Sequence, residues 1–255
     1  LELFHGPTCA FKDFGGRFMS RLVAHFSQNQ KITILAATSG DTGSAVAHGF
    51  LNIPNTEVIL LYPSGKVSHI QEQQLTTMGG NIIALEIDGV FDDCQTLVKS
   101  AFNDPDLKQK YQLTSANSIN IARLIPQTFY YFYAYAQLKK LGLDTPPLFS
   151  VPSGNFGNLT AGLIAMKMGL PVSHFIAATN ANDTFPKYLA TGLFSPQASK
   201  QTISNAMDVG NPSNAARIIK LFPNIQSTRQ IITSESFSDK ETANAMLEVY
   251  QKHQY

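Results

Sequence analysis

The first half of the chain alternates short apolar runs with amphipathic stretches. The apolar runs are rich in β-branched residues, which is typical of strands buried on both faces of a sheet. The stretches between them carry helix-forming residues and are followed by glycine or proline. The pattern predicts strands over Ile32–Ala37, Val58–Tyr62 and Ile82–Ile87, and helices over Ser44–Leu51, Val67–Met78 and Phe91–Phe102. Because strands and helices alternate, we expect βαβ units in an α/β fold with a parallel sheet.

The second half continues this alternation after one long aromatic-rich stretch. Residues Ile121–Leu141 read as a helix, and Pro126 inside it predicts a kink or a late start, since proline lacks the amide hydrogen. The aromatic side chains could stack on nucleic-acid bases, but core packing is favoured because no basic residues surround them. A break is expected at Gly142–Pro147. We expect further strands over Leu148–Val151 and Phe175–Ala178, and further helices over Leu159–Met168, Ala215–Leu221 and Lys240–His253.

The composition excludes several classes of protein. The chain has 255 residues, enough for one large domain or two small ones, and a net charge of +1 from 19 Lys and Arg against 18 Asp and Glu. This balance gives no electrostatic reason to expect nucleic acid or an anionic membrane as a partner. Charged residues make up only 15%, below the roughly 25% that is usual. No apolar run approaches the about 20 residues that span a bilayer, and no signal peptide is visible.

The cysteines Cys9 and Cys94 imply neither a disulfide framework nor a metal site. Two cysteines are too few for a disulfide-rich fold, and no second cluster stands beside them to complete a metal site. We therefore expect two reduced thiols, no metal ion and a cytoplasmic protein.

The first candidate for chemistry is Lys12, which stands between Phe11 and Asp13 with Phe14 following. Apolar neighbours lower the pKa of a lysine by desolvation and expose a nucleophilic amine. Such an amine can form a Schiff base with an aldehyde cofactor. The alternative is a lysine whose stem lies among aromatic rings while its amine reaches the surface.

The second candidate is a loop within Ser150–Gly162, where a strand runs through two glycines into a helix. Gly154 and Gly157 allow the backbone to approach an anion closely. Successive amides and the start of a helix near Asn158 would form a cradle for phosphate. Because no lysine follows and the glycine spacing differs from that of a dinucleotide fingerprint, the loop fits a small phosphate group. The alternative is a plain turn between a strand and a helix.

The third candidate is Thr38–Gly43, with the sequence TSGDTG, between a predicted strand and helix. Its hydroxyls and the amides at a helix start are suited to hold a carboxylate. Asp41 and Thr42 could equally be a simple helix cap. A nucleophilic lysine, a phosphate cradle and a carboxylate grip are together what a pyridoxal-phosphate enzyme acting on an amino acid needs.

These segments also resemble those of a known family. The run PTCAFKDFGG resembles the lysine signature of the serine/threonine dehydratase-like, fold type II pyridoxal-phosphate enzymes, TSGDTG their substrate-carboxylate loop and PSGNFGNLTAG their phosphate-binding loop. Within them the chain is most similar to the threonine synthase family. The segments that carry this similarity are ELFHGPT at residues 2–8, SANSIN at Ser115–Asn120, FIAATNANDT at Phe175–Thr184 and SNAMDVGNPSN at Ser204–Asn214.

The resemblance implies the conversion of O-phospho-L-homoserine and water into L-threonine and phosphate, the last step of threonine biosynthesis. Lys12 would bind the cofactor as a Schiff base and move the substrate's α and β protons. The cofactor phosphate would be held by Ser153, Gly154, Asn155, Phe156 and Gly157. The substrate or the cofactor's phenolic oxygen would face Thr38, Ser39, Asp41 and Thr42. Because the substrate is a phosphate ester, a second anion site is required, for which the candidates are Lys66, Asn117, Asn120 and Arg123.

The resemblance also implies two lobes with parallel-rich sheets flanked by helices. Residues 31–115 would form a smaller lobe, and residues 1–30 and 116–255 parts of a larger, cofactor-binding lobe. Segments of the family before and after this chain would be missing, among them the threonine-bearing stretch that meets the pyridine nitrogen. The low charge content would then reflect faces that those segments cover, and we expect exposed apolar patches there. The alternatives are a serine/threonine dehydratase-like lyase, a truncated inactive fragment and a binding protein that has lost catalysis.

Overall fold

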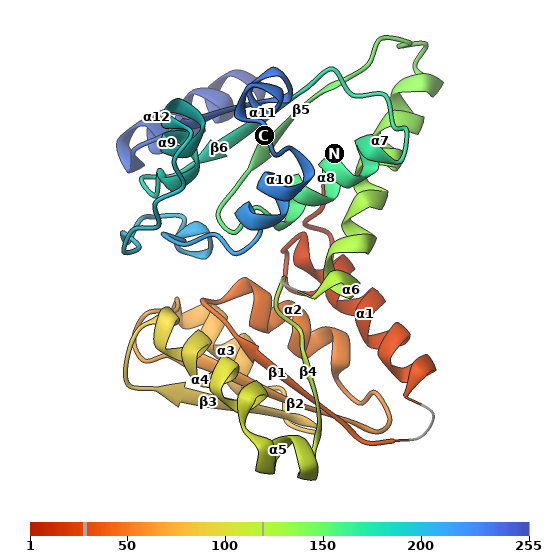
Figure 1. Ribbon diagram of the computed structural model, residues 1–255, viewed down its shortest axis with the longest axis vertical. Helices are drawn as coiled ribbons and strands as arrows, with labels where there is room; N and C mark the ends of the chain where they lie inside the picture. Colours follow the sequence, from red (N-terminus) through yellow and green to blue (C-terminus); the bar gives the residue numbers. More distant parts are fainter. Residues whose placement is uncertain (28–29, 119, 255) are drawn as a thin grey trace. The chain divides into compact units, whose positions relative to one another are not determined.

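The fold is described from a computed structural model of the chain, which describes residues 1–27, 30–118 and 120–254. The chain divides into two compact units, Leu1–Tyr130 and Tyr131–Tyr255. Each unit is built around its own parallel sheet flanked by helices (Figure 1). The predicted α/β class with parallel sheets is confirmed. The assignment of residues 1–30 and 116–255 to one lobe stays a prediction.

The first unit contains a four-stranded sheet in the order β3-β2-β1-β4, with every pair of neighbours parallel. Its register places Ile34 of β1 opposite Val58 of β2 and Thr114 of β4. Three of the strands were predicted, two of them with their bounds unchanged. The strands are β1 (Ile32–Ala37), β2 (Thr56–Pro63), β3 (Ile82–Ile87) and β4 (Gln112–Ser115).

Helices cover both faces of this sheet, because alternate residues of a strand point to opposite sides. Ile34 and Ala36 enter one hydrophobic cluster, and Leu35 and Ala37 enter the other. The first cluster includes side chains of α1 (Lys12–Phe26), α2 (Asp41–Phe50) and α3 (His69–Thr76), and the second those of α4 (Phe91–Asn103). The first unit also contains α5 (Pro105–Lys110), α6 (Ile121–Leu124) and the 3-10 helix η1 (Ile125–Gln127).

The predicted long helix is interrupted at Pro126. The chain forms α6, then η1 around the proline, and then α7 (Thr128–Lys140), inside which the boundary between the units falls. A proline amide cannot donate the next helical hydrogen bond, so the regular helix restarts after it. The predicted kink or late start is confirmed.

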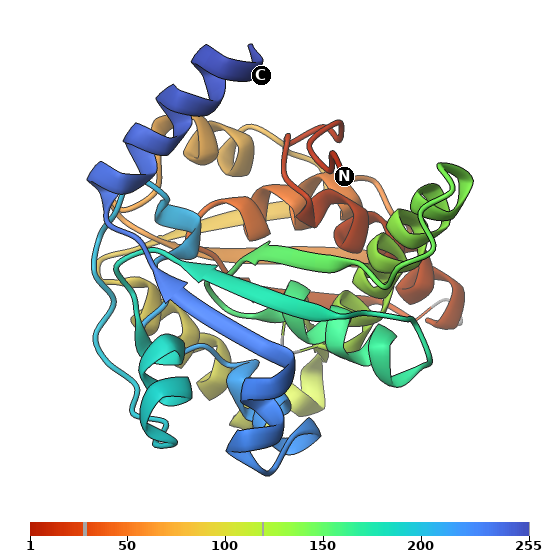
Figure 2. The same cartoon turned by 90° about the horizontal axis from the view of Figure 1, so that it is seen from above.

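The second unit contains a three-stranded parallel sheet in the order β5-β6-β7, whose strands lie side by side in Figure 2. The strands are β5 (Leu148–Pro152), β6 (His174–Thr179) and β7 (Ile232–Ser236). Its helical elements are α8 (Gly157–Lys167), α9 (Thr184–Thr191), η2 (Asn205–Met207), α10 (Ala215–Leu221), α11 (Ile225–Ile231) and α12 (Asp239–His253). The predictions for α8, α10 and α12 are confirmed to within two residues at each end.

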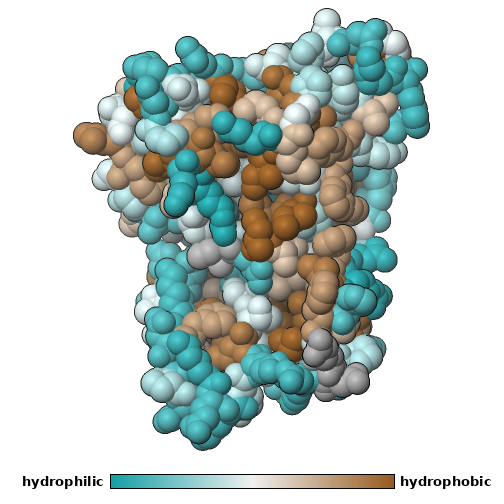
Figure 3. Space-filling view, turned by 45° about the vertical axis from the view of Figure 1, so that its right-hand side comes forward, coloured by the Kyte–Doolittle hydropathy of each residue, from teal (hydrophilic) through white to brown (hydrophobic). Residues whose placement is uncertain are grey.

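Large apolar side chains are exposed in both units. Figure 3 shows apolar residues interspersed among polar ones over the visible face. On α12, which buries none of its residues, Met246 is 65% and Tyr250 58% exposed. Exposed apolar side chains on this scale agree with the low charge content, while their grouping into patches covered by further segments stays a prediction.

Candidate functional site

Lys12 is the first residue of α1, and the loop that precedes it is fastened by Asp13. The Asp13 carboxylate accepts hydrogen bonds from the Thr8 amide at 2.9 Å and the Thr8 hydroxyl at 2.7 Å. Gly6 leaves room for this carboxylate, since a Cβ at Gly6 would lie 2.3 Å from Asp13 Oδ2. The Tyr130 hydroxyl donates to the Phe11 carbonyl at 2.7 Å. These bonds fix the backbone on both sides of Lys12.

The Lys12 amine is buried and faces one carboxylate. The Lys12 side chain is 14% exposed, and its Nζ lies 3.5 Å from Asp41 Oδ2 and 5.5 Å from the centre of the Phe11 ring. Burial lowers the pKa of Lys12, and the nearby Arg123 charge lowers it further, against the opposing effect of Asp41. The side chain therefore does not extend to the surface, and its free amine form is favoured relative to that of an exposed lysine.

The loop Thr38–Gly43 is shaped by the hydroxyl of Thr38. This buried Oγ1 accepts from the Gly40 amide at 3.0 Å and the Gly43 amide at 2.7 Å. Helix α2 begins at Asp41, three residues earlier than the predicted start at Ser44, because this bonding folds the loop into the first turn. The prediction that residues 41–43 precede the helix is wrong.

The hydroxyls of Ser39 and Thr42, in the same loop, do not stabilise its backbone in the way that the Thr38 hydroxyl does. In the described ranges Ser39 and Thr42 make no side-chain hydrogen bond, and both are half-buried. The N-cap residue of α2 is Gly40, which has φ of 135° and no side chain, and the Thr38 hydroxyl accepts only from the Gly43 amide in the first turn of this helix. Hydroxyls and uncapped amides at a helix start are the groups that a ligand carboxylate would meet.

Replacement of Thr38 by valine is expected to destabilise the chain by about 2 to 3 kcal/mol. Valine keeps the shape of the side chain but leaves the amides of Gly40 and Gly43 without their acceptor in a buried place. Urea unfolding followed by circular dichroism measures the loss. The matched control is Thr42→Val, which removes a hydroxyl that makes no hydrogen bond and is expected to cost little. Equal losses in the two variants would contradict the role of Thr38.

Three predicted substrate residues hold the segment between β4 and α6. The Asn117 side chain accepts from the Ala37 amide at 3.1 Å and donates to the Ala37 carbonyl at 2.6 Å. Asn120 caps α6 by accepting from the Ala122 amide at 3.0 Å. Arg123, 2% exposed, donates to the Ala116 carbonyl through Nη1. Ile119, within the predicted segment Ser115–Asn120, lies outside the described residues.

Two of the predicted cationic groups differ sharply in their surroundings. The Nε of Arg123 is buried and is the one such side-chain atom without a hydrogen-bond partner in the described part of the chain. Lys66 is exposed in the turn between β2 and α3 and forms no ion pair there. Within the first unit, the charges of Asp41 and Arg123 both affect the Lys12 amine. Lys66, by contrast, offers a charge that is exposed to solvent.

The predicted phosphate loop follows β5 in the second unit. Ser153 is buried, and its hydroxyl donates to the Val151 carbonyl at 2.9 Å. Phe156 has φ of 59°, a left-handed conformation that turns the chain into α8. No side chain caps this helix, which begins at Gly157. Gly154 lies against Met207, where a Cβ would be 2.7 Å from the Met207 Cα, so glycine is needed for close packing.

A segment distant in sequence supports this loop. The Asn155 side chain accepts from the Ser213 amide at 2.6 Å and from the Ser213 hydroxyl at 3.0 Å. The Asn214 side chain donates to the Asn155 carbonyl at 3.0 Å. Two of the segments that carry the family resemblance, PSGNFGNLTAG and SNAMDVGNPSN, are thus bonded to each other.

A third segment that carries the family resemblance, FIAATNANDT, is bonded to SNAMDVGNPSN through Asp208. The Asp208 carboxylate accepts from the Asn180 side chain at 2.9 Å, from the Thr202 hydroxyl at 2.7 Å and from the Thr202 amide at 3.0 Å. Asn180 follows β6 within FIAATNANDT. Since the partners satisfy the carboxylate, the network fixes the chain that backs the loop.

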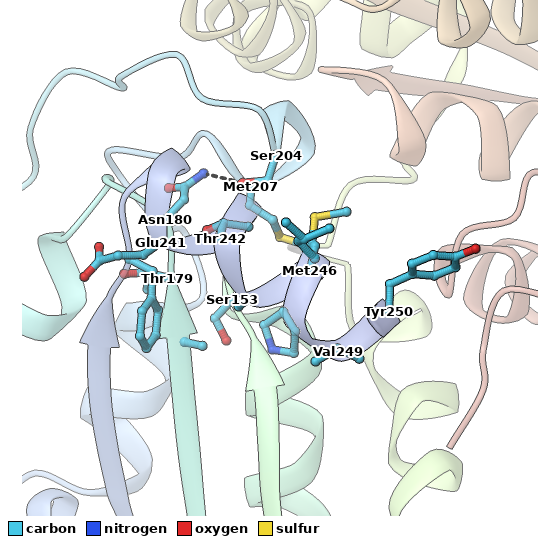
Figure 4. A pocket seen from close by; sticks show the side chains of 15 residues that line it. Ser153, Thr179, Asn180, Ser204, Met207, Glu241, Thr242, Met246, Val249 and Tyr250 are labelled. Carbon is cyan, nitrogen blue, oxygen red and sulfur yellow. Dashed lines mark hydrogen bonds between the residues drawn. The ribbon is translucent and has the colours of Figure 1, made fainter. Parts of the chain in front are cut away.

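A pocket of about 850 Å³ opens at the carboxyl ends of β5 and β6. Figure 4 shows its side chains, with Ser153 just after the end of β5, Thr179 at the end of β6 and α12 beside them. Ligands of parallel α/β sheets bind at the carboxyl ends of the strands. The lining is mostly apolar, and Asn180, Ser204, Glu241 and Thr242 are among its polar members.

Three residues that contact the site were not predicted as site residues from the sequence, namely Asp13, Gln71 and Tyr130. The sequence does indicate a structural role for Gln71, because a serine three residues before a glutamine is typical of a capping box, which Ser68 and Gln71 form at the start of α3. Its contact with Asp41 joins positions thirty residues apart. Such a contact depends on how α2 and α3 pack, which the sequence pattern does not specify.

Comparisons with known proteins agree with these features. A family model described as pyridoxal-phosphate dependent enzyme matches residues 1–255. The chain is 53% identical over 249 residues to a threonine synthase of Serratia marcescens, covering 98% of this chain and 58% of that protein. It is 58% identical over 222 residues to a threonine synthase of Escherichia coli (strain K12), covering 87% of this chain and 52% of that protein. The chain thus spans little more than half the length of these curated relatives.

Solved structures show the same likeness. The crystal structure of threonine synthase from Escherichia coli matches with a TM-score of 0.92 and 52% identity, covering 98% of this chain and 58% of that chain. A structure of threonine synthase from Brucella melitensis with pyridoxal phosphate bound matches with a TM-score of 0.90 and 36% identity, covering 100% of this chain and 61% of that chain. A serine racemase from Dictyostelium discoideum, at 14% identity and a TM-score of 0.69, shows the fold alone. The predicted fold type II architecture is confirmed.

Two further features concern the described residues only. None of their helices is long and apolar enough to cross a membrane. They contain no group of three or more His, Cys, Asp or Glu side chains that could hold a metal ion.

Proposed function

Because the chain belongs to the family of pyridoxal-phosphate dependent enzymes, we propose that it carries the cofactor-binding lysine of a threonine synthase, which converts O-phospho-L-homoserine and water into L-threonine and phosphate. The observation that carries the proposal is the buried Lys12 amine beside Asp41, with its pKa lowered by burial. The choice of reaction is supported by the identity of 53% to a threonine synthase over 98% of this chain.

Two groups of residues each fit one part of the cofactor. Its aldehyde reacts with an amine in the free base form, and the burial that lowers the pKa of Lys12 favours that form. Its phosphate requires backbone amides, which the uncapped start of the eleven-residue helix α8 and the loop Ser153–Gly157 offer. When bound, pyridoxal phosphate withdraws electrons from the substrate's α-carbon and makes its proton acidic.

Lys12 would move protons in this reaction. The free amine Nζ accepts a proton, and the resulting ammonium is stabilised by Asp41 at 3.5 Å. The conversion breaks the bond between the γ-carbon and the phosphate oxygen, which leaves as phosphate, removes a proton from the β-carbon, adds a proton at the γ-carbon and adds the hydroxyl of water at the β-carbon. A base that can both take and return protons is required for these changes at the α- and β-carbons.

The substrate has two anionic groups, a carboxylate and a phosphate, and different predicted residues would bind each of them. The substrate carboxylate would be held by the hydroxyls of Ser39 and Thr42 and by the first backbone amides of α2. Lys66 would hold the substrate phosphate as a point charge, with Arg123 as a buried source of positive potential. Asn117, Asn120 and Thr38 would act by shaping the backbone to which these groups belong.

The compartment proposed for this reaction is the cytoplasm. Both cysteines are free thiols, and burial raises the pKa of Cys94 to about 11. A buried protonated thiol is inert and is compatible with a reducing compartment.

Turnover measurements test the reaction. The chain supplied with pyridoxal phosphate is expected to release inorganic phosphate from O-phospho-L-homoserine and to form L-threonine in equal amount, and a Lys12→Ala variant is expected to do neither. Release of ammonia from L-threonine without phosphate release would support a dehydratase instead. A chain that binds the cofactor through Lys12 but releases no phosphate would support the role of Lys12, refute the proposed reaction for this chain and leave the inactive fragment as the explanation.

A further inference from the structure

One hydrogen bond fixes the carboxylate that faces Lys12. The Gln71 Nε2 donates to Asp41 Oδ1 at 2.6 Å. The other oxygen of the same carboxylate, Oδ2, lies 3.5 Å from Lys12 Nζ. The Asp41 carboxylate therefore stands between an amide donor of α3 and the amine of α1, with one oxygen for each.

The opposite end of the Gln71 amide is fixed as well. Its Oε1 accepts from the Ser68 amide at 3.1 Å and from the Ser68 hydroxyl at 3.0 Å, which closes the capping box of α3. With its oxygen engaged at Ser68, the amide must present its nitrogen to Asp41. The loop before α2 runs directly against this side chain, since a Cβ at Gly40 would lie 2.4 Å from Gln71 Cδ.

We propose that Gln71 is a positioning residue, which holds the Asp41 carboxylate against the Lys12 amine. The inference rests on the role proposed above for Lys12. Among the described residues of the first unit, two charged groups act electrostatically on this amine, Asp41 from α2 and Arg123 from α6, and their effects on its pKa are opposite. Arg123 is held in place by its bond to the Ala116 carbonyl, and burial of the amine is the largest effect on its pKa, so a change in the placement of Asp41 would change how easily the amine gives up its proton.

The reactivity of the Lys12 amine measures this placement without cofactor or turnover. Trace acetylation by acetic anhydride modifies only the free amine, and peptide mass spectrometry gives the rate at Lys12 relative to exposed Lys240 in the same sample. Below its pKa the rate at Lys12 follows the fraction of amine that is unprotonated. A variant that frees the carboxylate therefore labels faster, and one that adds negative charge labels slower.

Three variants separate positioning from helix capping. Gln71→Leu removes both functions, and we expect labelling of Lys12 about threefold to tenfold faster because the carboxylate no longer stabilises the ammonium as well. Gln71→Glu keeps the capping box, since glutamate accepts the same bonds from Ser68, but it cannot donate to Asp41 and adds a negative charge, so labelling slows. Ser68→Ala removes the cap and keeps the donor to Asp41, and the rate stays at the wild-type value.

Two outcomes would overturn the role proposed for Gln71. A rate in Gln71→Leu equal to wild type, or a change in Ser68→Ala as large as that in Gln71→Leu, would show that Gln71 serves helix α3 alone. Because labelling needs no substrate, absence of phosphate release in the turnover assay refutes the proposed reaction without altering these rates.

Discussion

A Lys12→Ala variant is expected to lose covalent attachment of pyridoxal phosphate altogether. In the unchanged chain the aldehyde would meet a buried amine whose pKa is lowered by desolvation, so we expect attachment at Lys12 to outcompete that at exposed lysines. Borohydride reduction after incubation with the cofactor, followed by peptide mass spectrometry, locates the attachment. Threonine formation, where it is measured, is expected to fall by at least about a thousandfold, because alanine can neither hold the cofactor nor transfer a proton.

The matched control for this variant is Lys31→Ala. Lys31 lies in the same unit, is 64% exposed and forms an ion pair with Glu57 at 3.1 Å. Its removal is expected to leave attachment at Lys12 unchanged, since exposed ion pairs contribute little. Attachment that persists in Lys12→Ala, or that is distributed evenly over exposed lysines in the unchanged chain, would refute the assignment of Lys12.

The strands that the sequence predicted with the right bounds are those with a continuous apolar run, whether central like β1 or at the edge of the sheet like β3. Strands β1 and β3 were predicted with their bounds because apolar runs mark them. Strands β4 and β7 were missed, since their sequences QLTS and ITSES are polar and they lie at the edges of their sheets. Backbone hydrogen bonds to the neighbouring strand stabilise these two strands, and the pattern of apolar and polar side chains does not indicate such bonds.

The site was predictable in its parts but not in its contacts. The aromatic neighbours of Lys12 suggested a desolvated amine, yet Phe14 is 45% exposed and the burial comes from packing that brings α2 and α6 to α1. Asn117 and Asn120 were expected to meet the substrate, whereas their side chains bond to the backbone. An asparagine in a loop looks the same in sequence whether it binds a ligand or the main chain.

Close packing of α1 on α2 is what places Lys12 beside Asp41. The two helices approach through glycines, since a Cβ at Gly49 would lie 2.6 Å from the Gly16 carbonyl carbon, and a Cβ at Gly16 would lie 2.5 Å from the Ala45 carbonyl oxygen. Backbone atoms cannot rotate away as a side chain can. A methyl group at either position therefore has to separate the helices.

Gly49→Ala is accordingly expected to lower the free energy of unfolding by about 3 kcal/mol or more, although alanine favours an isolated helix. Urea unfolding measures this loss, and acetylation of Lys12 in the folded variant is expected to be faster because Asp41 moves away from the amine. Gly15→Ala is the matched control on α1, where the nearest atom to a new Cβ is the Arg123 carbonyl oxygen at 3.3 Å, so a small backbone shift suffices. If Gly49→Ala were as stable as Gly15→Ala and its Lys12 labelling unchanged, the glycine contact between α1 and α2 would not be what sets the distance between the amine and the carboxylate.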